Sequence, residues 1–358
     1  MLELALLASL QQQASPNPDN SYLFFVASEG FDQVALVRFG PTGARIEHRT
    51  PIKLPSIETT GPLAVVVAPG GQDYYVTTAH GFPTGELLKL RIGADSAFGG
   101  QPTDTLQARE PISAFPAALQ VSPDGEYAWV TNSTPEEARE PSSISVVYLQ
   151  QMVEVARIAT CAGPRGGRLT ADGTRHYSVC MLDDQLVEID VNAMKIARRL
   201  ALSTAGQQRC APSAVTVAAD GVRLFVACQR SNDVIEVDAR TWSVTRRLAV
   251  GTGPGDLAAT RDGRVLVVTN HGSQNVSLVD LPSGRELARL ATLRAFPAGV
   301  VISPDDRYAF VSVAGSGTDP GTVEIIDLVA GTTVATVEVG RGAGGIAFWK
   351  MVARKAAK

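Results

Sequence analysis

A short phrase recurs along this chain and constrains its fold more than any other feature of the sequence. The stretch SPDGEYAWVTN at 122–132 joins a tight turn to a short apolar strand. Seven segments align with its last four residues: FVAS 25–28, YVTT 75–78, WVTN 129–132, YSVC 177–180, FVAC 225–228, VVTN 267–270 and FVSV 310–313. Repetition at a regular spacing predicts an array in which each unit buries its apolar faces against its neighbours.

Each unit is expected to form a small antiparallel sheet. Six copies follow a tight turn such as PDGE or ADGT, whose Asp and Gly residues suit the positive φ angles of a hairpin connection. An apolar strand precedes each turn. An alternating strand such as QLVEIDV follows each copy, and in most units a fourth strand such as KIARRLAL comes next. The sequence therefore predicts four-stranded meanders.

The spacing of the units identifies the architecture. The repeats begin at Pro62, Pro116, Pro164, Pro212, Pro254, Pro297 and Ala343. These starts are 42 to 54 residues apart, which is typical of propeller blades. We predict an all-β, seven-bladed β-propeller over 22–349 as a single domain, with four antiparallel strands in each blade.

The two ends of the array are complementary. The copy at 25–28 has no first strand before it, whereas the segment AGGIAFW at 343–349 is a first strand with nothing after it. We expect this C-terminal strand to pair with the N-terminal strands and complete one blade. Closing the ring in this way also removes the exposed sheet edges of an open array.

The YVTN phrase after an SPDG turn resembles the YVTN family of seven-bladed β-propellers, and the resemblance covers 22–349. The strand pattern is also similar to that of lactonase-type propellers of the 6-phosphogluconolactonase kind. The resemblance implies the ring architecture. It implies little about activity, because propellers serve as binding modules, enzymes and assembly subunits. No catalytic motif of a family carries over to residues of this chain.

Charge and hydropathy narrow the classes of partner. The net charge is −4, so no global positive field attracts nucleic acid, and none is expected as a partner. The sequence contains no apolar run of 18 residues, so it predicts no transmembrane helix. The segment 1–21 is interpreted either as a signal remnant or as a docking helix. The basic tail 350–358 suggests a peripheral contact with an acidic surface.

The four cysteines occur in the fourth and fifth units. Folding each hairpin about its turn brings Cys161 near Cys180 and Cys210 near Cys228, which predicts two disulfides within blades. The other pairings, free thiols and a four-thiolate metal site are alternatives, although the short C-x-x-C spacing typical of zinc is absent. Disulfides would indicate a periplasmic or extracellular location. No metal or cofactor is expected.

Functional side chains are expected on the loops around one mouth of the central channel. His80 and His271 lie in comparable loops and are candidates for an acid, a base or a ligand. Five arginines map to the same face and could bind a carboxylate or phosphate: Arg165, Arg209, Arg230, Arg294 and Arg341. Ordinary surface histidines and a mixed-charge face are the alternative interpretations, whereas the strand residues His48 and His176 are interpreted as structural.

The main functional hypothesis is a binding or assembly propeller, located outside the cytoplasm, that contacts a protein partner. Insertions at 93–107 and 135–143 interrupt the repeat, and the blades do not need them. The alternative is a lactonase-like or other small-molecule enzyme that uses the loops of the channel mouth. A metal or redox accessory protein is the weaker alternative. The glycines at 340, 342 and 345 fit G-x-G-x-x-G, but they lead into a strand, which indicates a turn.

Overall fold

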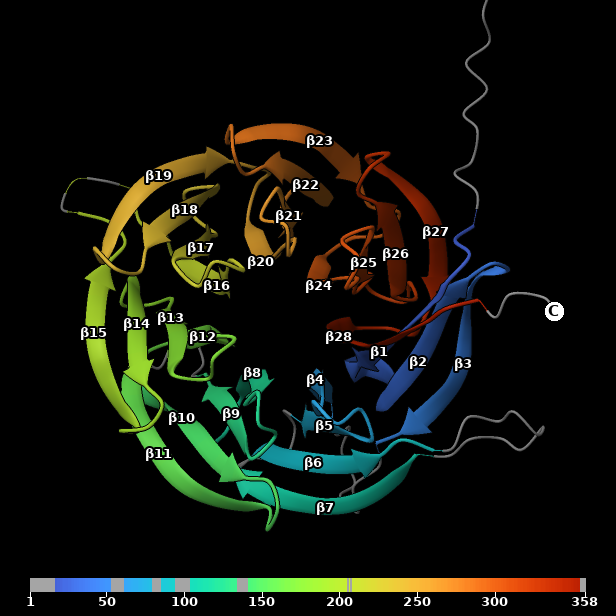
Figure 1. Ribbon diagram of the computed structural model, residues 1–358, viewed down its shortest axis with the longest axis horizontal. Coiled ribbons are helices and arrows are strands. Elements are labelled where there is room, and N and C mark those ends of the chain that lie inside the picture. Colours follow the sequence, from blue (N-terminus) through green and yellow to red (C-terminus); the bar gives the residue numbers. More distant parts are fainter. Residues whose placement is uncertain are drawn as a thin grey trace, which may run out of the picture.

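The computed structural model describes residues 17–52, 61–78, 85–93, 104–133, 141–204, 206 and 208–354. They form seven four-stranded antiparallel sheets arranged in a ring, as predicted (Figure 1). The first blade consists of β28 (Ala343–Val352), β1 (Ser21–Ser28), β2 (Gln33–Gly40) and β3 (Gly43–Pro51), with a short 3-10 helix, η1 (Glu29–Phe31), after β1.

The other six blades follow in chain order. The second has β4 (Pro62–Val67), β5 (Asp73–Thr78), β6 (Gly85–Arg91) and β7 (Thr105–Ile112), and the third has β8 (Pro116–Val121), β9 (Tyr127–Asn132), β10 (Pro141–Tyr148) and β11 (Val153–Ala162). The fourth has β12 (Pro164–Leu169), β13 (Arg175–Cys180), β14 (Gln185–Asp190) and β15 (Lys195–Ala201), and the fifth has β16 (Pro212–Val217), β17 (Arg223–Cys228), β18 (Asp233–Asp238) and β19 (Ser243–Ala249). The sixth has β20 (Pro254–Ala259), β21 (Val265–Asn270), β22 (Asn275–Asp280) and β23 (Arg285–Ala291), and the seventh has β24 (Pro297–Ile302), β25 (Tyr308–Val313), β26 (Thr322–Asp327) and β27 (Thr332–Glu338). The innermost strand of each blade begins at the residue predicted from the repeat.

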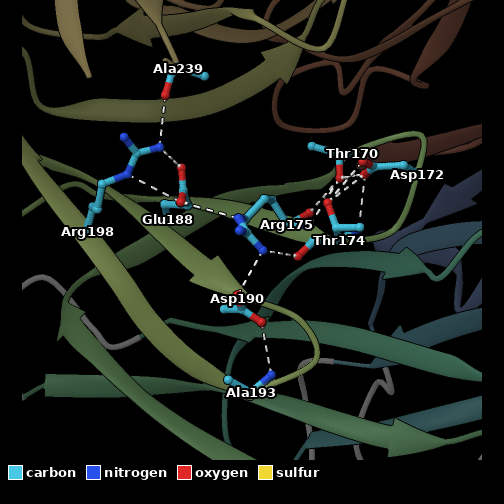
Figure 2. A network of polar contacts seen from close by, with 9 residues as sticks. All are labelled: Thr170, Asp172, Thr174, Arg175, Glu188, Asp190, Ala193, Arg198 and Ala239. Atoms are coloured by element: carbon cyan, nitrogen blue, oxygen red, sulfur yellow. Dashed lines mark hydrogen bonds and ion pairs between the residues drawn. The ribbon is translucent and has the colours of Figure 1, made fainter. Parts of the chain in front are cut away.

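The recurring turn phrase is explained by its hydrogen bonds. In the third blade the Ser122 hydroxyl donates to Asp124 Oδ1, and the Glu126 N–H donates to the same oxygen at 2.9 Å. The Tyr127 N–H donates to Ser122 Oγ at 2.9 Å, and Gly125 has a φ of +76°, which glycine adopts with little strain. The same arrangement surrounds Asp172 in the fourth blade (Figure 2). The phrase therefore recurs because each copy builds one hairpin.

The ring closes as predicted. Strand β28 pairs with β1 in antiparallel register, with Phe24 opposite Phe348 and Val26 opposite Ile346 (Figure 1). It continues to Val352, beyond the predicted end of the propeller at 349. The core lies between blades: the ring of Phe24, for example, packs against Phe310 of the seventh blade with centroids 4.4 Å apart.

Charged residues at the ends of the third strands have structural roles. Arg175 lies between Glu188 and Asp190 (Figure 2) and forms ion pairs with them at distances of 3.4 and 2.9 Å. Arg198 also pairs with Glu188, and its Nη2 donates to the Ala239 carbonyl of the fifth blade at 2.8 Å. The Arg198 hydrogen bond links the outer strand β15 to the fifth blade, and the other ion pairs lie within the fourth blade, so these charged groups have structural partners.

Both predicted disulfides are present, Cys161–Cys180 and Cys210–Cys228. The placement of the first one within a blade was wrong, because Cys161 belongs to β11 of the third blade and Cys180 to β13 of the fourth. The error arises because the outer strand of one blade runs on directly into the innermost strand of the next. Within the described residues, no helix is long and apolar enough to cross a bilayer.

Candidate functional site

A cavity of about 520 Å³ lies on the axis of the ring. The innermost strands of all seven blades surround it: β4, β8, β12, β16, β20, β24 and β28 (Figure 1). Met181, Gln229 and His271 complete its lining, and each directly follows the second strand of its blade. Loops after the second strands and before the first strands also bond to each other, for example through the His271 N–H to the Gly253 carbonyl at 2.9 Å. The cavity therefore opens on the predicted loop face.

Most of the cavity wall is made of small or apolar residues, and the exceptions are informative. The third residue of the innermost strand is Ala64, Ala118, Gly166, Ala214, Asp256, Gly299 or Gly345. The fifth residue is Val66, Gln120, Arg168, Thr216, Ala258, Val301 or Ala347. Asp256 and Arg168 are thus charged where the equivalent residues are uncharged. Because the blade folds without a charge at these positions, both residues are candidates for function.

The Asp256 carboxylate is held by backbone groups of two blades. Its Oδ2 accepts a hydrogen bond from the Val300 N–H of the seventh blade at 3.1 Å, and its Oδ1 accepts one from the Leu257 N–H at 2.9 Å. Asp256 is among the residues that line the cavity, and its carboxyl is enclosed by the ring. Burial raises the pKa of Asp256, while the charge of Arg168 and the two backbone N–H groups oppose that shift. A carboxylate with a raised pKa is a stronger base than one at the surface.

Two arginines line the cavity on one strand, β12. Arg168 Nε is buried and has no hydrogen-bond partner among the described residues. Its positive charge acts on Asp256, which lies on β20, two blades further round the ring. Arg165 lines the same cavity and belongs to the set predicted from the sequence.

The other four predicted arginines do not line this cavity. Arg209 Nη2 donates to the Leu182 carbonyl at 2.6 Å, and Arg294 lies 3.8 Å from Glu338. Arg230 and Arg341 are exposed. Of the five predicted arginines, only Arg165 therefore lines the cavity. Its neighbour there is Arg168, which was not predicted from the sequence.

Of the two candidate histidines, His80 lies outside the described residues. His271 lies at the mouth of the cavity, where it is exposed and stacks on Phe296 with ring centroids 4.7 Å apart. The two strand histidines lie away from the cavity lining: His48 Nε2 is 3.0 Å from Asp104 Oδ2, and His176 is fully buried.

The residue before each innermost strand adopts a left-handed conformation in all seven blades. These residues are Gly61, Phe115, Gly163, Ala211, Gly253, Phe296 and Gly342, with φ between +49° and +71°. For a residue other than glycine this conformation costs about 1–2 kcal/mol. Two phenylalanines nevertheless occupy the position, and both are exposed, Phe115 at 39% and Phe296 at 37%.

Metal ligation finds no support in the described residues. No three His, Cys, Asp or Glu side chains there are grouped to hold a metal ion. All four cysteines form disulfides, so the alternative of a four-thiolate site is wrong.

Arg168 and Asp256 were not predicted as site residues, because they lie on strands whose apolar pattern is already accounted for by the repeat. A position-by-position alignment of the seven innermost strands would have found them, since each departs from the small or uncharged residues of the other blades.

Comparisons with known proteins agree with the fold. A family described as "Lactonase, 7-bladed beta-propeller" matches residues 144–304, and one described as "Cytochrome D1 heme domain" matches residues 260–350. Each match covers less than half of the 358 residues. No curated protein matches the chain significantly.

Several solved structures are similar over most of the chain. A periplasmic gluconolactonase from Pseudomonas aeruginosa is 18% identical, with a TM-score of 0.70 over 94% of this chain and 100% of that one. A putative 6-phosphogluconolactonase from Bacteroides uniformis is 15% identical, with a TM-score of 0.72 over 92% and 99%. Hydrazine synthase from Kuenenia stuttgartiensis is 16% identical, with a TM-score of 0.64 over 91% and 99%. At these identities the likeness establishes that the chain has the fold of a seven-bladed β-propeller.

Proposed function

We propose that this protein hydrolyses small lactones outside the cytoplasm and binds its substrate in the central cavity. The observation that carries the proposal is the position of the lactonase match. Residues 144–304 include all four charged or titratable residues among the described lining of the cavity, Arg165, Arg168, Asp256 and His271. The haem-domain match contains one of them, His271, whose ring is stacked on Phe296, so we base no function on it.

Under this proposal, charged residues that line the cavity would act in ester hydrolysis. Water adds to the lactone carbonyl carbon, the carbonyl oxygen becomes an oxyanion, and the ring C–O bond then breaks to give a hydroxy acid. Arg165 and Arg168 would stabilise the oxyanion and the product carboxylate. Asp256 would accept the proton of the attacking water and return it to the departing ring oxygen.

The proposal is tested by Asp256→Asn, with δ-valerolactone and glucono-δ-lactone as substrates in a pH-stat assay. Loss of the base should lower kcat by roughly 10²–10⁴-fold. Asp319→Asn is the matched control, because Asp319 is exposed and does not line the cavity. Absence of hydrolysis above the spontaneous rate in the wild-type protein, or a wild-type rate in Asp256→Asn, would overturn the proposal.

A pH profile gives a second readout of the same pair. The base must be ionised, so the rate should rise with pH through the raised pKa of Asp256. Because the charge of Arg168 lowers that pKa, Arg168→Gln should move the acid limb of the profile to higher pH. A lower rate with an unmoved limb would mean that Arg168 does not act on the base.

The location rests on the two disulfides, which persist mainly in oxidising compartments. The hypothesis of a protein partner stays a prediction. Residues 135–140 of the second insertion and residues 94–103 of the first lie outside the described residues.

A further inference from the structure

The mouth of the cavity carries exposed aromatic rings at positions where the backbone favours glycine. Four of the seven residues that precede the innermost strands are glycines, and the fifth blade has the small residue Ala211. Phe115 and Phe296 stand at the same position in the third and seventh blades, with φ of +53° and +67°. The fold does not need a large side chain there, since five blades are built without one. Backbone strain of this kind is typically retained at functional sites.

The apolar surface around Phe296 continues into the cavity. The ring of Phe296 stacks on His271, whose side chain lines the cavity. Leu293, in the same loop before β24, is 64% exposed. Pro297 and Ala298, which follow Phe296 directly, also line the cavity. A ligand that reaches Arg168 and Asp256 inside therefore has an apolar surface beside it at the entrance.

On the other side of the ring, Phe115 occupies the corresponding place. It precedes β8, whose residues Ala117 and Ala118 line the cavity, and its carbonyl accepts the Ser133 N–H at 2.7 Å. The mouth therefore has an exposed ring on each of two well-separated blades. Such rings bind apolar groups by burial and stacking.

We propose that the ligand of this cavity is amphipathic, with its ester or carboxyl group at Arg168 and Asp256 and an apolar substituent against Phe296 at the mouth. This inference rests on the proposed function for the polar end of the ligand and adds the class of substituent: an alkyl or aryl group rather than a further polar one.

Two ring-opened acids, 5-hydroxypentanoate and 5-hydroxydecanoate, provide a matched pair that differs by a five-carbon chain. Calorimetry measures the affinity of each without requiring turnover. Burial of part of the chain should make the longer acid bind at least about tenfold more tightly to the wild-type protein. Phe296→Gly should abolish that preference and leave the affinity for the shorter acid unchanged.

The choice of glycine keeps the variant folded. At a φ of +67° it relieves backbone strain, which offsets the lost contact with His271. Ala211→Gly is the matched control, because it makes the same backbone change at the equivalent position of the fifth blade, where the side chain is buried. The control should retain the preference for the longer acid, and circular dichroism should show that both variants are folded.

The outcomes separate this inference from the proposed function. Equal affinity of the wild-type protein for the two acids, binding of neither, or a preference that survives in Phe296→Gly would overturn the inference. If the preference depends on Phe296 but δ-valerolactone and δ-decanolactone are not hydrolysed, the inference of an amphipathic ligand is supported and the proposed lactone hydrolysis is contradicted. Hydrolysis of both lactones with equal kcat/KM, unaffected by Phe296→Gly, would support the proposed function and contradict the inference of an apolar substituent on the ligand.

Discussion

His176 is fully buried between the third and fourth blades, where its ring stacks on Trp129 with centroids 5.3 Å apart. Neither ring nitrogen has a hydrogen-bond partner among the described residues. Gly167 provides the space, because a Cβ there would lie 2.9 Å from the imidazole and 2.8 Å from Thr131 Oγ1. Burial, and secondarily the charge of Arg168, lower the pKa of His176 to about 3. The folded ring therefore keeps this side chain neutral.

This neutrality makes stability depend on pH. The pKa of His176 is lower in the folded protein than its ordinary value of about 6.5, so the unfolded chain takes up the proton first as the pH falls. The free energy of unfolding should therefore decrease from about pH 6.5 towards pH 3, by about 1.4 kcal/mol per pH unit from this group.

The test replaces His176 by leucine, the residue at the equivalent positions 224 and 266. Urea unfolding at pH 7, 6 and 5 should show a shallower loss of stability in His176→Leu than in the wild-type protein. His271→Leu serves as the control, because that ring is exposed, and it should retain the wild-type slope. Identical slopes for wild type and His176→Leu would show that this histidine is not the group responsible.

Single site residues were harder to predict than the fold, for a physical reason. The sequence places a residue on a loop or a strand, but the direction of its side chain depends on packing between blades. Of the predicted residues, Arg165 and His271 line the cavity, whereas Arg209 bonds instead to the Leu182 carbonyl. Asp256 could have been found only by comparing it with its equivalents in the other blades.

The disulfides act on the strands that carry the site. Cys161–Cys180 fastens the end of β11 to the end of β13, on either side of β12 with its two arginines. Cys210–Cys228 fastens the segment just before β16 to the end of β17. Each closes a loop of nearly twenty residues, with sequence separations of 19 and 18.

Removing one bridge should lower the free energy of unfolding measurably. The double variant Cys210→Ala with Cys228→Ala should lose about 3 kcal/mol, because the unfolded chain regains the entropy of an open loop. Chemical unfolding under non-reducing conditions measures the difference, and the wild-type protein treated with reductant provides a comparison for both bridges together. Equal stability of the variant and the oxidised wild type would contradict a stabilising role. Thiol counting on the denatured wild-type protein should find none.

The strands themselves could be predicted well, because their signals are local. Alternating apolar residues define each strand, and the turn with Asp and Gly fixes where one hairpin ends, as the bonds around Asp124 show. The blade to which Cys161 belongs was not predicted, since β11 runs without a turn signal into β12. Local patterns thus define elements better than they assign them to sheets.

The cavity exists only because the ring is closed. Each blade contributes one innermost strand to the wall, and Gly344, Gly345 and Ile346 of β28 form the part between the seventh and second blades. In an open array, stability is approximately a sum of units and their nearest-neighbour interfaces, so loss of a terminal strand removes only the contributions next to it. In a closed ring the terminal strand completes the sheet of one blade and packs against the blades on either side of it.

The role of β28 in closing the ring can therefore be tested by ending the chain after Gly342, which removes β28. The truncated protein loses the pairing of β28 with β1 and uncovers the core around Phe24, so it should lose its cooperative thermal transition and bind an apolar dye. A chain ending at Val352 is the control, because it lacks only residues beyond the strand and should unfold as the full chain does. Adding a synthetic peptide of residues 343–352 to the truncated protein should restore the transition. If the truncated chain unfolds cooperatively at the temperature of the full chain, the blades are stable without closure, and the wall of the cavity must be maintained by the remaining six innermost strands.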